Sequence, residues 1–327
     1  MQKLMGVESM NLWKLRLSMF GTLTLIIGFS TLAFAAILYF TGALSIMSLL
    51  ILLVPFNIIQ WLLAPYMIDA IYNVKEVKPS ENPELCHMVE RLSKRSGISA
   101  PRLMLARIPI PNAFAYGSPI AGNRVAVTEG LLKELNTGEV EAVLGHEIGH
   151  LKHRDMQIMM FASFLPAVFF YLGYWLMLSA GYSRDRREGG AAIIGIVSIA
   201  LYWILTLLSL SLSRLREYYA DQHSVSIVED GRRKLSVALA KIASSSKRLK
   251  ARRGDLSGFN SFKALFIADP ESAVGEPRFS AFGFTLNEEE LVRRIISRKV
   301  TAADRFAEIF STHPNMVKRL RAILGLS

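Results

Sequence analysis

The segment His146-Glu147-Ile148-Gly149-His150 contains residues whose types and spacing suit metal chemistry. Two histidines four residues apart lie on one face of a helix, one turn apart. Their imidazole nitrogens can bind one Zn²⁺ at about 2.0–2.1 Å each. Glu147 is rotated by about 100° around the helix, so its carboxylate can reach a water on the metal without binding the metal. The pattern predicts a zinc site in which Glu147 is the general base.

A catalytic zinc needs a third protein ligand and an open fourth position. Cys86 is the only cysteine of the chain, so the third ligand must be a histidine or a carboxylate. One class of zinc proteases uses a histidine ten residues after the first, but Met156 occupies that position here. We expect Glu217 to be the third ligand. Asp221, one turn later on the same face, would accept the second N–H of a ligating histidine.

Two alternatives to this ligand set stay open from the sequence. Glu217 and Asp221 could belong to a solvated helix face and pair with Arg214 or Arg216. His153 could act as the third ligand, although the metal would then be bound by one helix alone.

Long uncharged segments must position these residues. No charged side chain occurs between Arg16 and Asp69, and two further uncharged runs extend over 156–183 and 189–213. One bilayer crossing takes about 20 apolar residues. The sequence therefore predicts an integral membrane protein with two hairpins of transmembrane helices. The four predicted spans are about 18–40, 44–64, 156–180 and 190–213.

The second hairpin brings the two halves of the metal site together. His150 lies six residues before the third span, about 9 Å along a helix, and Glu217 lies four residues after the fourth, about 6 Å. Antiparallel spans emerge side by side, so both residues are expected at similar heights above the bilayer. The predicted divisions of the chain are 1–71, 72–155, 156–213 and 214–327.

Composition limits the class of protein and its orientation. The chain has 38 Lys+Arg and 27 Asp+Glu, a formal charge of +11, and 51% apolar residues, which excludes a disordered chain. Most basic residues lie in or beside the water-soluble segments, which predicts a multi-pass protein of the cell membrane with those segments in the cytoplasm. Arg184, Arg186 and Arg187 would lie on the opposite side, against this rule. The basic segment 247–253 lacks interleaved aromatic residues, so the lipid bilayer is expected as a partner and nucleic acid is not.

The water-soluble parts are expected to be mainly α-helical with a small β-sheet. Residues 83–96 have helical spacing, with Pro83 in the first turn and Gly97 as the C-terminal cap. A second helix begins with Thr137 as its N-cap and meets no helix breaker before Pro166. Short β-like runs occur at 102–108, 113–116 and 124–128.

The sequence resembles the M48 metallopeptidases. The resemblance rests on the motif at 146–150 and on Glu217-Tyr218-Tyr219-Ala220-Asp221, which follows a membrane hairpin. Residues 111–117 are similar to the family's Asn-Ala-Phe/Tyr strand, and residues 311–314 are similar to its Thr-His-Pro segment. Four spans are typical of the HtpX branch, whereas the related Ste24 prenyl-protein proteases have seven. Nearly the whole chain is covered, but residues 244–300 match poorly.

The resemblance implies a gluzincin-type zinc protease domain, facing the cytoplasm and attached to four transmembrane helices. It implies one zinc ion per chain, bound by His146, His150 and Glu217, with Glu147 as the general base. Polypeptides, membrane proteins among them, would be the substrates.

The resemblance also implies roles for residues outside the two helices. Asn112 and His313, together with Arg319, would stabilise the anionic tetrahedral intermediate. The alternatives are a turn residue after Pro111 for Asn112 and a helix-start residue for His313. The strand residues that would pair with the substrate backbone are Ala113, Phe114 and Ala115.

These features predict a zinc-dependent membrane endopeptidase that cleaves misfolded or damaged membrane proteins, a role in stress response and protein quality control. One alternative is a prenyl-protein (CAAX-type) protease. An alternative of another class is a non-catalytic membrane scaffold or transporter subunit with a structural zinc, which would require four protein ligands rather than three.

Overall fold

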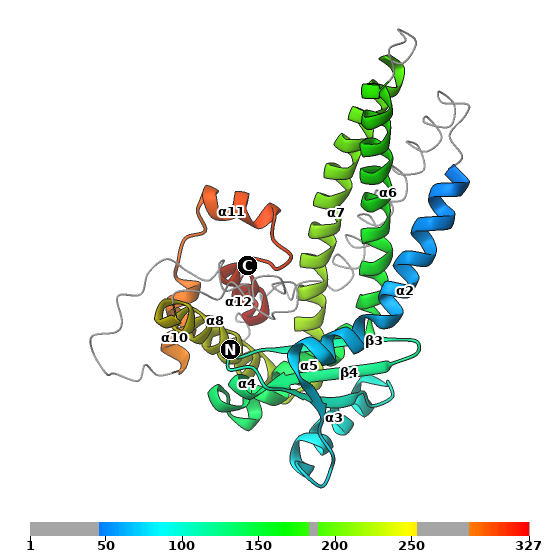
Figure 1. Cartoon of the computed structure of the whole chain (residues 1–327). Helices are drawn as coiled ribbons and strands as arrows, with labels where there is room; N and C mark the ends of the chain where they lie inside the picture. Colours follow the sequence, from blue (N-terminus) through cyan, green and yellow to red (C-terminus); the bar gives the residue numbers. More distant parts are fainter. Residues whose placement is uncertain (1–45, 183–188, 254–287, 327) are drawn as a thin grey trace.

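The computed structural model describes residues 46–182, 189–253 and 288–326, and helices dominate them (Figure 1). The predicted span at 18–40, the arginines between the second pair of spans, and residues 254–287 lie outside the described residues. The helices are α2 (Ile46–Tyr72), α3 (Pro83–Ser96), α4 (Glu129–Glu134), α5 (Thr137–Lys152), α6 (Asp155–Tyr182), α7 (Gly189–Ile227), α8 (Gly231–Arg253), α10 (Glu288–Ile296), α11 (Ala302–Ile309) and α12 (Met316–Leu324). The strands are β1 (Val74–Glu76), β2 (Arg102–Ala106), β3 (Ala113–Ser118) and β4 (Gly122–Thr128).

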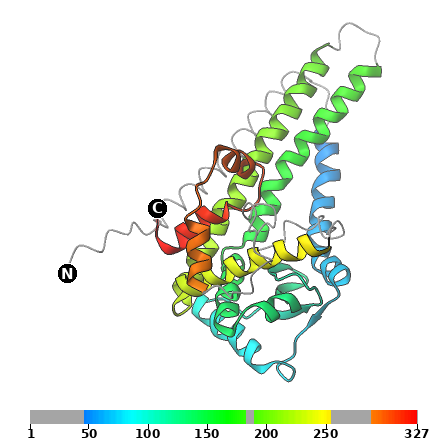
Figure 2. The same cartoon turned by 90° about the vertical axis from the view of Figure 1, so that its left-hand side faces the viewer.

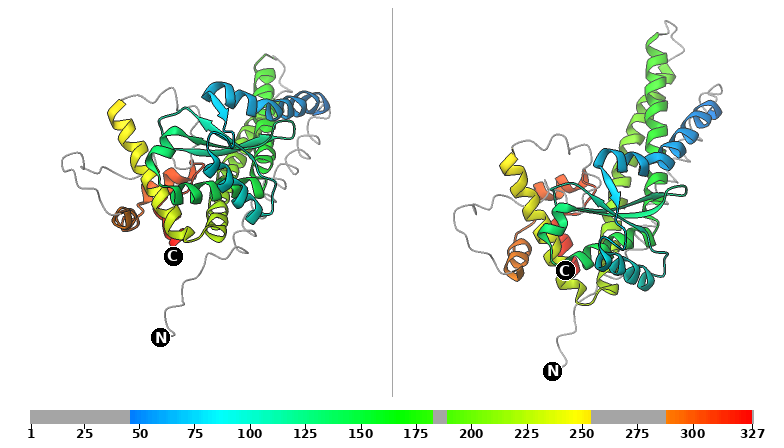
Figure 3. Two further views of the ribbon diagram at one scale, coloured as in Figure 1. Left: turned by 90° about the horizontal axis from the view of Figure 1, so that it is seen from below. Right: turned by 60° about the horizontal axis from the view of Figure 1, so that its bottom comes forward.

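The four strands form one mixed sheet in the order β1-β2-β4-β3, so β3 lies at an edge. β2 and β4 are parallel, whereas β1 pairs with β2 and β3 pairs with β4 in antiparallel fashion. Side chains alternate between two buried faces. Leu103 and Val125 pack with the cluster that includes α3, α5 and α8, whereas Met104 and Ala126 pack with the end of α2. Figure 3 shows the sheet between these helices.

The helix over 83–96 is confirmed, and Gly97 ends it in the left-handed conformation with φ +66°. Its N-terminus is capped by Asn82, whose side chain accepts a hydrogen bond from the Leu85 backbone N–H. The three predicted strands are also present, with ends shifted by two residues at most.

Two expectations about the motif helix are wrong. Its N-cap is Asn136 rather than Thr137, because the Asn136 and Glu139 side chains accept hydrogen bonds from each other's backbone N–H in a capping box. The helix also does not continue to Pro166. It ends at Lys152, where Arg154 takes a left-handed φ of +54°, and α6 begins at Asp155 with Pro166 inside it.

Two of the described helices, over Asp155–Tyr174 and Gly190–Ile227, are long and apolar enough to cross a membrane. They belong to α6 and α7, which run side by side and project beyond the rest of the molecule (Figures 1 and 2). Large apolar side chains such as Phe161 and Ile196 are exposed on them. α7 continues without interruption from this apolar stretch into the metal site.

α2 is tied to the sheet at its C-terminal end. Asp69 accepts a hydrogen bond from the Tyr116 hydroxyl at 2.7 Å and forms an ion pair with buried Arg124. α2, α6 and α7 leave the domain that contains the sheet in the same general direction (Figure 1).

Candidate metal centre

Close packing of α5 against α7 creates the centre. A Cβ atom at Gly149 would lie 3.2 Å from the Ala220 Cα and 3.2 Å from the His223 Cβ, so only glycine permits this approach without displacement. One turn away, the Ser224 hydroxyl donates a hydrogen bond to the Ala142 carbonyl at 2.6 Å. The motif glycine thus brings the α5 histidines within reach of α7 carboxylates.

Three side chains from these two helices converge. His146 Nε2 lies 3.1 Å from His150 Nε2 and 3.6 Å from Glu217 Oε2. His150 Nε2 lies 3.5 Å from Glu217 Oε1. The three residues form a group that could hold a metal ion. His146 and Glu217 are buried, whereas His150 is partly accessible.

The separations between these atoms fit a tetrahedral zinc. Ligands about 2.05 Å from zinc and about 109° apart are separated by about 3.3 Å. The two imidazole nitrogens are 3.1 Å apart, and the Glu217 carboxylate approaches them with different oxygens, Oε2 at 3.6 Å from His146 and Oε1 at 3.5 Å from His150, all close to that value. Among the described residues three protein donors converge, so a zinc ion held by them would keep a fourth position for water or substrate.

A carboxylate stands behind each histidine. Asp221 Oδ1 lies 2.9 Å from His146 Nδ1, and Asp155 Oδ2 lies 2.6 Å from His150 Nδ1. A carboxylate accepts hydrogen bonds, so each Nδ1 carries its proton and each Nε2 turns a lone pair toward the other. The sequence analysis anticipated contact with a histidine for Asp221 but missed Asp155. The sequence shows a carboxylate five residues after His150, but only the helix break at 153–154 places it beside that histidine.

Burial and neighbouring charges shift the pKa values of the two histidines in opposite directions. Burial lowers the pKa of His150 to about 4, and the nearby His146 adds to the lowering. Burial also disfavours the charged form of His146, but the hydrogen bond and charge of Asp221 outweigh burial and raise its pKa. These three donors lie close enough together for one divalent cation to contact all of them.

The solvated-face alternative for Glu217 and Asp221 is wrong, because both carboxylates are buried. Arg216 instead donates to Asp155 Oδ2 across 2.8 Å, and both of these side chains are buried. Arg214 points to the backbone of the α11–α12 connection. His153 packs its ring against Tyr219, with 3.9 Å between the centroids, and is not among the converging donors.

Arg319 of α12 lies beneath the two α7 carboxylates. Its Nε and one terminal nitrogen donate to Asp221 at 2.7 and 2.8 Å, and its other terminal nitrogen lies 3.0 Å from Glu217 Oε2. The side chain is fully buried, and these two carboxylates raise its pKa despite that burial. The guanidinium therefore stays charged and balances two negative groups. It lies against the carboxylates of Glu217 and Asp221, where it orients them.

His313 reaches the centre from the segment before α12. Its Nδ1 lies 3.4 Å from Glu217 Oε2, within ion-pair distance, and its Nε2 has no hydrogen-bond partner among the described residues. The ring is buried. A buried nitrogen without a partner beside a metal site is a candidate to contact a substrate group.

Asn112 immediately precedes the edge strand β3, which contacts α5. Thr128 holds the Asn112 backbone, accepting from its N–H at 2.9 Å and donating to its carbonyl at 3.0 Å. Ala113 and Phe114 are buried, with Phe114 packed near Tyr72 on the face that meets α2. Ala115 is partly exposed. Glu147 is buried on α5 between the two histidines.

Comparison with known proteins agrees with this geometry. The model of peptidase family M48 matches residues 79–327. Protease HtpX homolog from Thermoplasma acidophilum is 36% identical over 321 residues, covering 95% of this chain and 96% of that protein. Protease HtpX homolog 2 from Saccharolobus solfataricus is 38% identical over 324 residues, with coverage of 95% and 96%.

A solved structure shares the fold. The crystal structure of S. mikatae Ste24p aligns with 95% of this chain at a TM-score of 0.53 and 17% identity. This chain spans 66% of the length of that protein. Together with the full-length sequence relatives, these matches lead to one conclusion: the chain belongs to peptidase family M48, and its similarity is to HtpX proteases.

Proposed function

We propose that this chain is a zinc-dependent endopeptidase that spans the membrane and cleaves misfolded or damaged membrane proteins. The observation that carries the proposal is the convergence of two facing imidazole nitrogens and the Glu217 carboxylate at tetrahedral separations. His146, His150 and Glu217 would bind one zinc ion. Zinc supplies a Lewis acid that polarises a carbonyl and makes water nucleophilic near neutral pH.

The remaining groups would handle protons and charge. Glu147 takes a proton from the attacking water and later delivers it to the leaving amine. His313, through its Nε2, and Asn112 donate hydrogen bonds to the oxyanion of the tetrahedral intermediate. Asp221 and Asp155 hold the two histidines in the tautomer that presents Nε2. Arg319 supports the site indirectly, because it holds the carboxylates of Glu217 and Asp221 in position.

The substrate would bind as an added strand. β3 is an edge strand that contacts the motif helix, so the free edge at 113–115 can pair with an extended polypeptide. Recognition through main-chain hydrogen bonds is largely indifferent to side chains. That property suits an enzyme of protein quality control and stress response, which must cleave many unfolded sequences.

The membrane placement is part of the proposal. Four spans would cross the cell membrane, with α6 and α7 as the second hairpin and the metal centre on the cytoplasmic side. The basic residues of the zinc-site domain favour that side. The apolar side chains exposed on α6 and α7 are those that a bilayer would cover.

The test uses the full chain purified in detergent. We expect one zinc per chain and chelator-sensitive cleavage of casein. Glu147→Gln should abolish cleavage while zinc stays bound, because the base is lost and the three ligands remain. Full activity of Glu147→Gln would contradict the assigned base, and a chain that binds no zinc would overturn the proposal.

Assays on the same purified chain distinguish two other functions from the proposed one. A prenyl-protein protease would cleave a prenylated peptide and leave casein intact. A structural zinc in a scaffold or transporter subunit would give full zinc content and no cleavage of either substrate.

A further inference from the structure

One helix of the described chain carries an apolar face that no other described element covers. On α11, Phe306 is 66% exposed, Phe310 just beyond it 53%, and Ile309 42%. The two phenylalanine rings contact each other, with centroids 5.5 Å apart. The opposite face is polar, since Glu308 pairs with Lys318 and accepts a hydrogen bond from a backbone N–H before α12. α11 is therefore amphipathic, with its apolar side turned outward.

The position of α11 is set by α7. Arg214 is the first charged residue after the uncharged run 189–213, so it marks the point where a membrane-spanning α7 would enter the headgroup region. Its guanidinium donates to the carbonyls of Ile309, at 3.2 Å, and Ser311, at 2.7 Å. The end of α11 is thus fixed at that level, and Figures 1 and 2 show α11 beside α7, farther from the sheet than α12.

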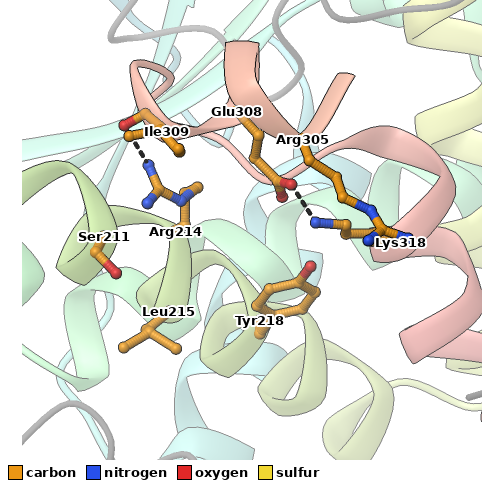
Figure 4. A pocket seen from close by; sticks show the side chains of 8 residues that line it. All are labelled: Ser211, Arg214, Leu215, Tyr218, Arg305, Glu308, Ile309 and Lys318. Atoms are coloured by element: carbon orange, nitrogen blue, oxygen red, sulfur yellow. Dashed lines mark hydrogen bonds and ion pairs between the residues drawn. The ribbon is translucent and has the colours of Figure 1, made fainter. Parts of the chain in front are cut away.

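Basic side chains line a cavity next to the C-terminal end of α11. A cavity of about 350 Å³ lies between α7 and the α11–α12 pair, and Arg214, Arg305 and Lys318 line it against the single carboxylate of Glu308 (Figure 4). Arg305 follows α11's first turn and is exposed. Basic residues at this level complement anionic lipid headgroups.

We propose that α11 is an interfacial helix that inserts Phe306, Ile309 and Phe310 among the lipids of the membrane that α6 and α7 cross. The inference rests on the membrane placement proposed above. Amphipathic helices with aromatic and basic residues lie in the interface plane in this way. The bilayer covers the outward face of α11, and Arg305 meets the headgroups at its border.

This contact has a consequence for the metal centre. α11 leads within four residues into His313, and Glu308 is tied to the start of α12, which carries Arg319. Lipid contacts that fix the position of α11 therefore also restrain the segment that places His313 beside Glu217.

The test measures lipid contact directly in the full chain, reconstituted in nanodiscs that contain anionic lipid. An environment-sensitive fluorophore is attached at Phe306→Cys or at Phe310→Cys, and quenching by spin-labelled phospholipids is recorded. The unsubstituted chain reports background labelling of the buried Cys86. His87→Cys, on an exposed face of α3, is the solvent control, and Ile196→Cys, exposed within the apolar stretch 190–213 of α7, is the bilayer reference.

We expect quenching at positions 306 and 310 to exceed that at position 87 several-fold. A spin label near the headgroup should quench them more than one deep in the acyl chain, and the reverse should hold at position 196. Quenching no greater than at position 87, while position 196 is quenched, would overturn the interfacial helix and leave the membrane placement intact. A blue-shifted emission without lipid quenching would also overturn it, because a second copy or residues 254–287 would then cover α11. Absence of quenching at position 196 would overturn both.

Discussion

The Asp155 carboxylate offers a sharp test of how the zinc centre is held. Its Oδ2 atom serves two partners, His150 Nδ1 at 2.6 Å and an Arg216 nitrogen at 2.8 Å. Asp155→Asn keeps an oxygen of similar size and position but removes the negative charge. The variant therefore weakens the hydrogen bond that orients His150 without removing a ligand.

The expected loss of zinc affinity follows from the hydrogen bond between Asp155 and His150, a proposed zinc ligand. Loss of such a partner lowers metal affinity by about 10–100-fold, or about 1.4–2.7 kcal/mol. Arg216 is buried and has lost its only ion-pair partner among the described residues, which places the expected effect toward the upper end. The zinc dissociation constant is measured by competition with a chromophoric chelator in detergent. Asp230→Asn is the matched control, because Asp230 pairs with Arg233 at 2.6 Å on an exposed surface.

An unchanged zinc dissociation constant for Asp155→Asn, in a chain with native circular dichroism, would refute the reasoning. It would mean that the tautomer and orientation of His150 are set by something other than Asp155. An equal weakening in Asp230→Asn would instead indicate a general electrostatic effect.

Three further predictions concern the same architecture. Glu217→Ala should abolish stoichiometric zinc by atomic absorption, whereas Glu229→Ala on an exposed position should keep it; retained zinc would remove Glu217 from the ligand set. Gly149→Ala should cost about 1–3 kcal/mol of stability and weaken zinc binding, because its Cβ would lie 3.2 Å from the α7 backbone. Gly190→Ala, where a Cβ meets no atom within 4 Å, is the control, and equal zinc dissociation constants would contradict the close-packing argument. Asn136→Ala should lower the stability of the zinc-site domain by about 1 kcal/mol through loss of the capping box, seen as a lower denaturation midpoint than for exposed Asn123→Ala.

Local signals predicted the elements whose ends depend on nearby residues. Pro83 and Gly97 delimit α3 because proline suits a first turn and glycine suits the left-handed cap, and both effects act within a few residues. The same logic placed the N-terminus of α5 one residue late, because Thr137 and Asn136 are both good caps and only the reciprocal bond with Glu139 decides between them.

The break between α5 and α6 could not be read from the sequence. Arg154 carries no conformational signature of its left-handed backbone, and the turn there is stabilised by tertiary contacts of the residues around it. That break places Asp155 at the start of α6, beside His150, so missing the break also hid Asp155 from the ligand network.

The convergence of His146, His150 and Glu217 was predictable because helical spacing and a hairpin are both regular. The relation of Arg319 to the site was not, since the guanidinium comes from a helix nearly a hundred residues beyond Asp221. A motif suggests that the arginine belongs to the centre, but only the coordinates show it bound to two carboxylates rather than directed at a substrate.

With α7 crossing the bilayer as proposed, its continuity would couple the lipid environment to the metal centre. One uninterrupted helix, from Gly189 to Ile227, carries both the apolar stretch and Glu217. In a thinner bilayer a long hydrophobic helix tilts, and each Å of hydrophobic mismatch costs a fraction of a kcal/mol. Such a tilt would displace the Glu217 carboxylate relative to the α5 histidines. Bilayer thickness would therefore alter the affinity of the site for the metal.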